Sequence, residues 1–195
     1  MNEAVDFKIV EEPKKPMAMH PKKFGMWLFM ASVLMLFISL TSAYIVRQAE
    51  GNWLYFDLPN LFLISSIVIV ASSITIQLGF WAAKKDNLER VKIMVSLTTI
   101  LGLAFLVIQY LGWKDLVANS IYLVGNPSGS FLYIITGLHA LHIVSAIVYL
   151  LIVLNAAFKE KIHAKNMARM EMCTTYWHFL GVLWLYLFVF LSLLR

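Results

Sequence analysis

Five long apolar stretches constrain this chain more than any other feature. They cover approximately residues 24–46, 60–83, 93–112, 131–158 and 174–194. A helix needs about 20 mostly apolar residues to cross the hydrocarbon core of a bilayer, and each stretch reaches that length. The stretches are continuous rather than alternating, which favours helices over membrane strands. The sequence therefore predicts an all-α, polytopic membrane protein with five transmembrane helices.

The composition agrees with one membrane-embedded unit. The chain is 61% hydrophobic and only 14% charged, whereas soluble domains are about 45–50% apolar and about 25% charged. Cys173 is the single cysteine, which excludes disulfide frameworks and multi-cysteine metal sites within the chain. The net charge of +5 comes from basic residues that flank apolar stretches. We therefore assign the basic residues to membrane orientation and expect no nucleic-acid partner.

The basic residues also predict the direction in which the chain crosses the membrane. All 16 Lys and Arg residues except Arg47, Lys114 and Arg195 precede the first stretch or lie in the second and fourth loops. The positive-inside rule then places the N-terminus in the cytoplasm and the C-terminus outside. We expect residues 1–23 to form a mostly extended cytoplasmic tail and residues 24–195 to form the membrane domain.

Small and polar residues mark the faces on which these helices are expected to pack. Membrane helices associate through close packing and hydrogen bonds, because lipid tails are as apolar as leucine. Residues of this kind recur at intervals of about seven, close to two helical turns. We expect packing seams at Gly25, Ser32, Ser39, Ser65, Ser72, Gly79, Gly102 and Gln109. A polar pore lining is the alternative, but no charged residue joins these stripes.

Three histidines are the candidates for chemistry inside the membrane. His139 and His142 share one helical face, and His178 lies in the last stretch. No Asp, Glu, Lys or Arg lies at the middle of a span, which disfavours an autonomous proton pump or a transporter. One hypothesis is a small haem- or metal-binding protein that uses the three histidines. The other is that they pack against neighbouring helices, because a pair on one helix cannot sandwich an iron.

Several motifs resemble subunit III of haem–copper oxidases, the cytochrome c and quinol oxidases. T-G-L-H-A-L-H-I (Thr136–Ile143) resembles the family signature T-G-x-H-G-x-H, and Y-W-H-F-L-G-V-L-W-L-Y-L-F-V (Tyr176–Val189) is similar to the family's closing motif. The segments Phe24–Ser32, Ser42–Ile45 and Leu101–Gln109 are similar too. The signature residues that the resemblance marks are Trp27, Ser32, Thr136, Gly137, His139, His142, Tyr176, Trp177, His178 and Trp184.

The resemblance implies a bacterial five-helix form of this subunit, in the plasma membrane. It implies two bundles, of two and three helices, separated by a V-shaped cleft that holds structural phospholipid. The subunit would be an accessory component without haem, copper or a catalytic centre of its own. Its principal partner would be catalytic subunit I of a proton-pumping oxidase, together with other oxidase subunits and membrane lipids. A larger respiratory supercomplex stays an open alternative.

Three positions depart from the family pattern. Carboxylates that the family usually carries are replaced by Val33, Gly112 and Gly181. The resemblance therefore implies a branch that keeps the scaffold and the signature histidines while its buried acids are lost.

Overall fold

Five α-helices make up almost all of the structure. The computed structural model describes residues 21–159 and 167–194. The helices are α1 (Pro21–Ala49), α2 (Asn60–Lys84), α3 (Leu88–Ala118), α4 (Pro127–Phe158) and α5 (Ala168–Leu193). Each is long and apolar enough to cross a membrane, so the predicted all-α architecture with five spans is confirmed. Residues 1–20 of the predicted tail lie outside the described part of the chain.

Most helices extend beyond the predicted spans, because backbone hydrogen bonding continues past the hydrocarbon-compatible residues until a cap stops it. Helix α1 already begins at Pro21, within the predicted tail. Helix α3 begins at Leu88 because the Asn87 side chain accepts a hydrogen bond from Arg90 N at 3.1 Å. Helix α4 begins at Pro127 because Asn126 accepts from Ser128 N at 3.0 Å, and proline suits the first helical position.

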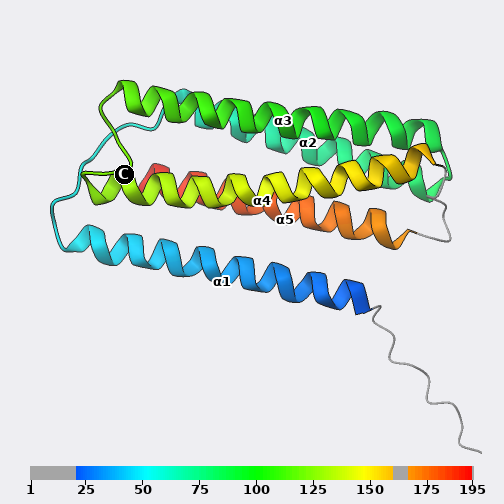
Figure 1. Cartoon of the computed structure of the whole chain (residues 1–195), viewed down its shortest axis with the longest axis horizontal. Helices are drawn as coiled ribbons and strands as arrows, with labels where there is room; N and C mark the ends of the chain where they lie inside the picture. Colours follow the sequence, from blue (N-terminus) through cyan, green and yellow to red (C-terminus); the bar gives the residue numbers. More distant parts are fainter. Residues whose placement is uncertain (1–20, 160–166, 195) are drawn as a thin grey trace, which may run out of the picture.

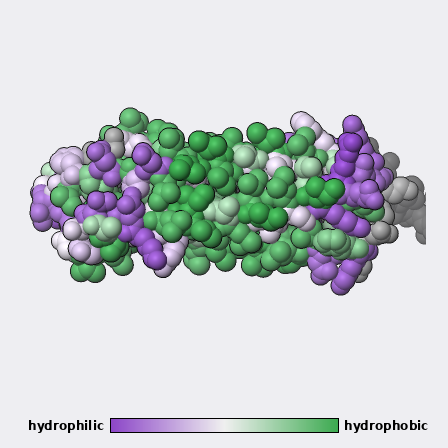
Figure 2. Space-filling model, turned by 90° about the horizontal axis from the view of Figure 1, so that it is seen from above, coloured by the Kyte–Doolittle hydropathy of each residue, from purple (hydrophilic) through white to green (hydrophobic). Residues whose placement is uncertain are grey.

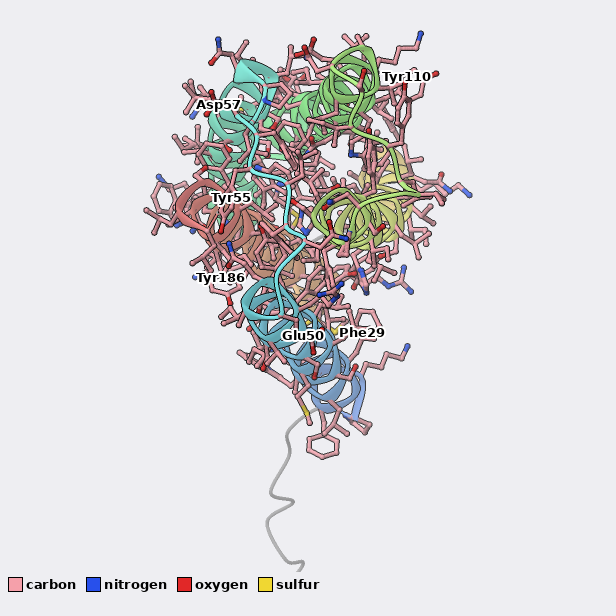
Figure 3. All side chains as sticks on the ribbon, turned by 90° about the vertical axis from the view of Figure 1, so that its left-hand side faces the viewer. Phe29, Glu50, Tyr55, Asp57, Tyr110 and Tyr186 are labelled. Atoms are coloured by element: carbon pink, nitrogen blue, oxygen red, sulfur yellow. The ribbon has the colours of Figure 1, made fainter. Side chains whose placement is uncertain are left out.

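Helices α2, α3, α4 and α5 surround a common interior and are called the four-helix bundle below. In this bundle α2 packs on α3 and α5, and α4 packs on the same two neighbours. Helix α1 lies outside the bundle against α4 and α5, as the side view and the end view both show (Figures 1 and 3). The prediction of separate bundles of two and three helices is therefore not confirmed, because α2 contacts α5 directly and closes one bundle of four.

The surface of the molecule has the pattern of a membrane protein. A hydrophobic middle separates two hydrophilic ends (Figure 2). Lys84 ends α2, Lys85 follows it in the turn, and Arg90 lies in the first turn of α3, all at the same end as the start of α1 (Figure 1). The loops after α1 and α3 lie at the other end. Among the described residues, the basic turn between α2 and α3 thus lies at the opposite end of the molecule from the loops after α1 and α3.

Candidate functional site

Two tryptophans of α5 fix the position of α5 against α2. The indole N–H of Trp177 donates to Ser72 Oγ at 3.0 Å, and that of Trp184 donates to Ser66 Oγ at 3.0 Å. All four side chains are buried. Each serine also donates to a backbone carbonyl of its own helix, at 2.7 Å for Ser72 and 2.8 Å for Ser66. A buried N–H without an acceptor is costly, so these two bonds favour one register of α5 on α2.

Glycines allow the large aromatic residues to lie close to neighbouring helices. A side-chain carbon at Gly102 on α3 would lie 2.6 Å from Trp177 Cη2, and one at Gly112 would lie 2.9 Å from Phe62 Cε2. At Gly79 on α2 such a carbon would lie 3.2 Å from Met94 Cβ. A carboxylate at Gly112 would therefore collide with Phe62. Phe62 occupies the space beside this glycine.

His139 lies at the point where four helices meet. Its side chain is fully buried. Its ring centroid lies 6.2 Å from that of Phe37 on α1, 6.0 Å from Phe105 on α3 and 5.1 Å from Trp184 on α5. Neither ring nitrogen has a hydrogen-bond partner among the described residues. The imidazole therefore acts as an aromatic packing unit that holds α4 against three neighbours.

His142 faces α1, and its hydrogen bond lies within its own helix. Its Nδ1 donates to the Leu138 carbonyl at 2.7 Å, and Phe37 and Phe29 lie against its ring at centroid distances of 5.8 Å and 6.4 Å. One turn further along α4, Ser145 Oγ lies 2.8 Å from the hydroxyl of Tyr176 on α5. These contacts connect α1, α4 and α5 on the side of the four-helix bundle that α1 covers.

His178 lies on a different side of the four-helix bundle. Its Nε2 donates to Gln77 Oε1 of α2 at 3.0 Å. The three histidines therefore contact different neighbours. Within residues 21–159 and 167–194 there is no group of three or more His, Cys, Asp or Glu residues that could hold a metal ion. The hypothesis of a shared haem or metal site lacks a converging ligand set in this arrangement.

The remaining predicted positions of α2 to α4 lie mostly inside the four-helix bundle. Thr136 accepts a hydrogen bond from Trp113 Nε1 at 3.1 Å, which joins α4 to α3. Ser65 and Gln109 are buried, and Gln109 Nε2 has no partner among the described residues. Gly137 is different, because no atom lies within 4 Å of a side-chain carbon built there. This glycine faces outward, beside a groove that Trp113 and Tyr133 help to line.

The seam predicted on α1 is not a contact within this chain. Gly25, Trp27, Ser32 and Ser39 are all exposed, and Trp27 has 56% of its surface accessible. The buried stripe of α1 consists instead of Met30, Val33, Phe37, Thr41 and Tyr44. Small residues indicate close approach in general and do not say which molecule approaches. A seam between this stripe of α1 and lipid or another subunit therefore stays a prediction.

Sequence reasoning missed two residues that secure the end of α5. The Tyr44 hydroxyl and the Gln48 amide both donate to the Leu194 carbonyl, at 3.1 Å and 2.8 Å. These bonds tie the end of α1 to the last turn of α5. Tyr44 lies within the Ser42–Ile45 segment that is similar to the family, but neither Tyr44 nor Gln48 carries a pattern that points to the Leu194 carbonyl.

Comparison with known proteins agrees with the motifs. The family model described as cytochrome c oxidase subunit III matches residues 12–194. A cytochrome c oxidase subunit 3 from Corynebacterium diphtheriae is 28% identical over 97% of this chain and 97% of the relative. A probable cytochrome c oxidase subunit 3 from Nocardia farcinica is 30% identical over 88% of this chain and 87% of the relative. A probable quinol oxidase subunit 3 from Staphylococcus saprophyticus is 25% identical over 85% of this chain and 85% of the relative. This chain therefore belongs to the cytochrome c oxidase subunit III family.

Proposed function

We propose that this chain is the accessory, non-redox subunit III of a proton-pumping haem–copper terminal oxidase. In this role it packs against catalytic subunit I in a bacterial plasma membrane and supports aerobic electron transfer to oxygen. The supporting observation, beside family membership, is the use of the three signature histidines. His139 packs among aromatic rings, while His142 and His178 bond to Leu138 and Gln77. The haem and copper would be held by partner subunits.

The direct test is purification of the tagged chain from its own membrane in a mild detergent. The proposal predicts haem signals in the optical difference spectrum and a large catalytic oxidase subunit in the mass spectrum. The bound partners are then removed, and the proposal predicts that the haem signal leaves with them. A chain that purifies without any oxidase subunit would contradict the proposal, and haem that stays on the stripped chain would revive the histidine-ligand hypothesis.

We propose further that the N-terminus faces the cytoplasm and the C-terminus faces outward. Lys84, Lys85 and Arg90 lie in or directly beside the turn between α2 and α3, and positive residues favour the cytoplasmic side. A single cysteine placed at Asp86, in a Cys173→Ser background, tests this in intact cells. The proposal predicts no labelling by a membrane-impermeant maleimide until the membrane is opened. Immediate labelling would contradict the orientation, and a cysteine at Asn52 is the matched control for the outer side.

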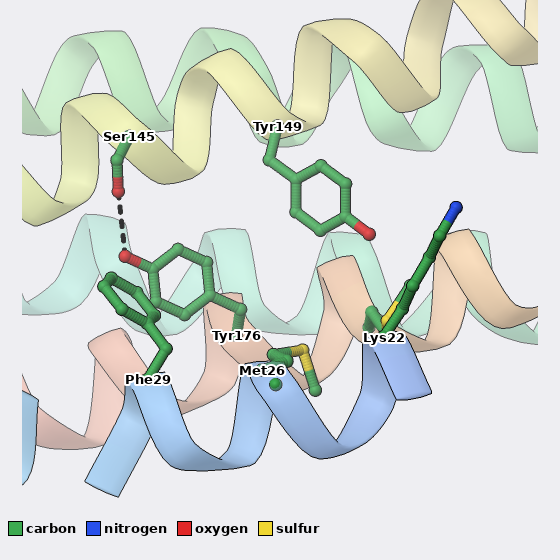
Figure 4. A pocket seen from close by; sticks show the side chains of 8 residues that line it. Lys22, Met26, Phe29, Ser145, Tyr149 and Tyr176 are labelled. Carbon is green, nitrogen blue, oxygen red and sulfur yellow. Dashed lines mark hydrogen bonds between the residues drawn. The ribbon is translucent and has the colours of Figure 1, made fainter. Parts of the chain in front are cut away.

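A structural phospholipid is proposed for the groove between α1 and the four-helix bundle. The groove has a volume of about 480 Å³, and Met26, Phe29 and Met172 give it an apolar lining, with Tyr149 and Lys22 toward one end (Figure 4). This lining suits the acyl chain of a phospholipid whose head group lies near the membrane surface. Gly25 lines the groove with open space around it, so Gly25→Leu should displace lipid counted by native mass spectrometry. An unchanged lipid count would contradict the assignment.

A further inference from the structure

A small notch opens on the outer face of α2 and α5. It has a volume of about 190 Å³. Its lining consists of Ile69, Val70, Ser73, His178, Gly181, Val182 and Leu185. Val182 and Val70 stand exposed at its rim. The notch is thus an apolar surface feature with polar side chains in its lining.

The polar lining of the notch offers hydrogen bonds that the described chain does not use. The Ser73 hydroxyl makes no hydrogen bond to any described residue, whereas the neighbouring Ser72 accepts from Trp177 and donates to a carbonyl. Gly181 leaves the hydroxyl accessible, since a side-chain carbon there would lie 3.1 Å from Ser73 Oγ. Gln77 lies one turn along α2 from Ser73, outside the lining of the notch. Its Oε1 accepts a hydrogen bond from His178, and its amide nitrogen still has two N–H groups that can donate to a partner.

The depth of the notch decides what can satisfy these groups. Ser73 lies near the middle of α2 and Gly181 near the middle of α5. At a rise of 1.5 Å per residue, both lie roughly 15–20 Å from either helix end. Lipid head groups and bulk water do not reach this depth, and acyl chains carry no hydrogen-bond acceptor. Polar groups at mid-membrane normally face protein, where side chains bond across helices.

We propose that the α2–α5 face is the docking surface for a transmembrane helix of the catalytic oxidase subunit. That helix places a carboxyl or carboxamide side chain into the notch, where it accepts a hydrogen bond from the Ser73 hydroxyl. Val70, Val182 and Leu185 contact the same helix around this hydrogen bond and keep water away from it. The inference rests on the proposed function and adds the face and the chemistry of the contact.

Photo-crosslinking in the intact complex tests the docking face without disturbing the notch. A photoreactive phenylalanine analogue replaces Val182, which is 68% exposed, or Leu141 of α4, which is 63% exposed and serves as the matched control. We expect the Val182 probe to form a protein crosslink to the catalytic subunit and the Leu141 probe to label lipid. A complex that purifies intact but shows only lipid labelling from position 182 would overturn the inference while leaving the proposed function standing.

Two substitutions test the chemistry of the notch in the same complex. Gly181→Leu fills the notch, and Gly137→Leu makes the same change on another outward surface. We expect Gly181→Leu to lower retention of the chain on the oxidase about tenfold, and Ser73→Ala to lower it about threefold, as expected for one interhelical hydrogen bond. Melting of each isolated chain in detergent checks folding. Full retention of the Ser73→Ala chain, or loss caused by Gly137→Leu alone, would overturn the proposal.

Discussion

The four-helix bundle and helix α1 are equally apolar but are held in place by different means. In the bundle, indole N–H groups donate to buried serines, and Trp177 and Phe62 lie over glycines of α3. Helix α1 instead buries one narrow stripe, from Met30 to Tyr44, and leaves most of its surface exposed. The difference shows that hydrophobicity brings helices into the membrane, whereas close packing and interhelical hydrogen bonds decide which of them form the interior.

Three separate sets of contacts hold α1 against the rest of the molecule. At the end of α1, Tyr44 and Gln48 bond to Leu194, and Tyr44 also packs edge-to-face on Trp53 at 4.6 Å. Phe37 packs in the middle against His139 and His142. At its start, the Lys23 ammonium pairs with Glu171 at 2.6 Å. The groove of Figure 4 lies between the last two attachments.

The largest effect is expected from Trp177→Ala in the four-helix bundle. The change removes a fully buried indole, its bond to Ser72 and its contact with Gly102. We expect the isolated chain to lose about 3–5 kcal/mol of unfolding free energy in a denaturing-detergent titration. Trp81→Ala is the matched control, since Trp81 is 53% exposed and its loss should cost little. Equal losses for both variants would remove the distinction between bundle and surface.

Overpacking the same contact should have the next largest effect. In Gly102→Ala the new methyl group would lie 2.6 Å from Trp177 Cη2, so the indole or a helix must shift. We expect destabilisation of about 1–3 kcal/mol, measured in the same titration. Gly137→Ala adds the same methyl group where no atom lies within 4 Å. If the two variants unfold alike, the close approach of α3 to α5 is contradicted.

Substitutions of His139 separate packing from ligation. Because the ring makes aromatic contacts and no hydrogen bond among the described residues, His139→Phe should cost less stability than His139→Ala. We expect the alanine variant to lose about 1–3 kcal/mol through the cavity it leaves. The melting temperature of each purified chain gives the order. A phenylalanine variant less stable than the alanine variant would show that the imidazole nitrogens carry an essential interaction.

The smallest effects are expected at the ends of α1. Gln48→Ala removes one hydrogen bond to the Leu194 carbonyl, and Lys23→Met breaks a partly exposed ion pair. We expect losses of about 1 kcal/mol or less from each. Spin labels on α1 and α4 should report a broader distance distribution in both variants, while the contacts within the four-helix bundle stay unchanged. A loss as large as that of Trp177→Ala would mean that α1 is part of the interior.

Much of the fold could be predicted from the sequence because membrane insertion depends on local composition. The five long apolar helices and the involvement of Ser72, Gly79 and Gly102 in close helix contacts follow from runs and spacings along one helix. The partner of each contact does not. Ser72 gives no sign that Trp177 bonds to it, and Gly25 carries the same seven-residue pattern as Gly79 but lines an open groove, where no atom lies within 4 Å of a side-chain carbon built there. Contact pairs depend on helix rotation, which tertiary packing sets.

Part of the candidate site could also be inferred from residue types alone. Two histidines on one helix lack the facing ligand that an iron would need, and this argument already favoured packing over ligation. The identity of the packing partners required the structure, because Phe37, Phe105 and Trp184 come from three other helices. The notch beside Gly181 was equally hidden, since it arises only where Ser73 of α2 meets α5.

The most direct test of the central claim is the haem content of the oxidase complex that carries His139→Phe. We predict that the complex keeps this subunit, its haem stoichiometry and its reduced-minus-oxidised spectrum, because the histidine packs α4 and holds no cofactor. Stoichiometric loss of haem or metal from a complex that still contains the folded subunit would contradict the account.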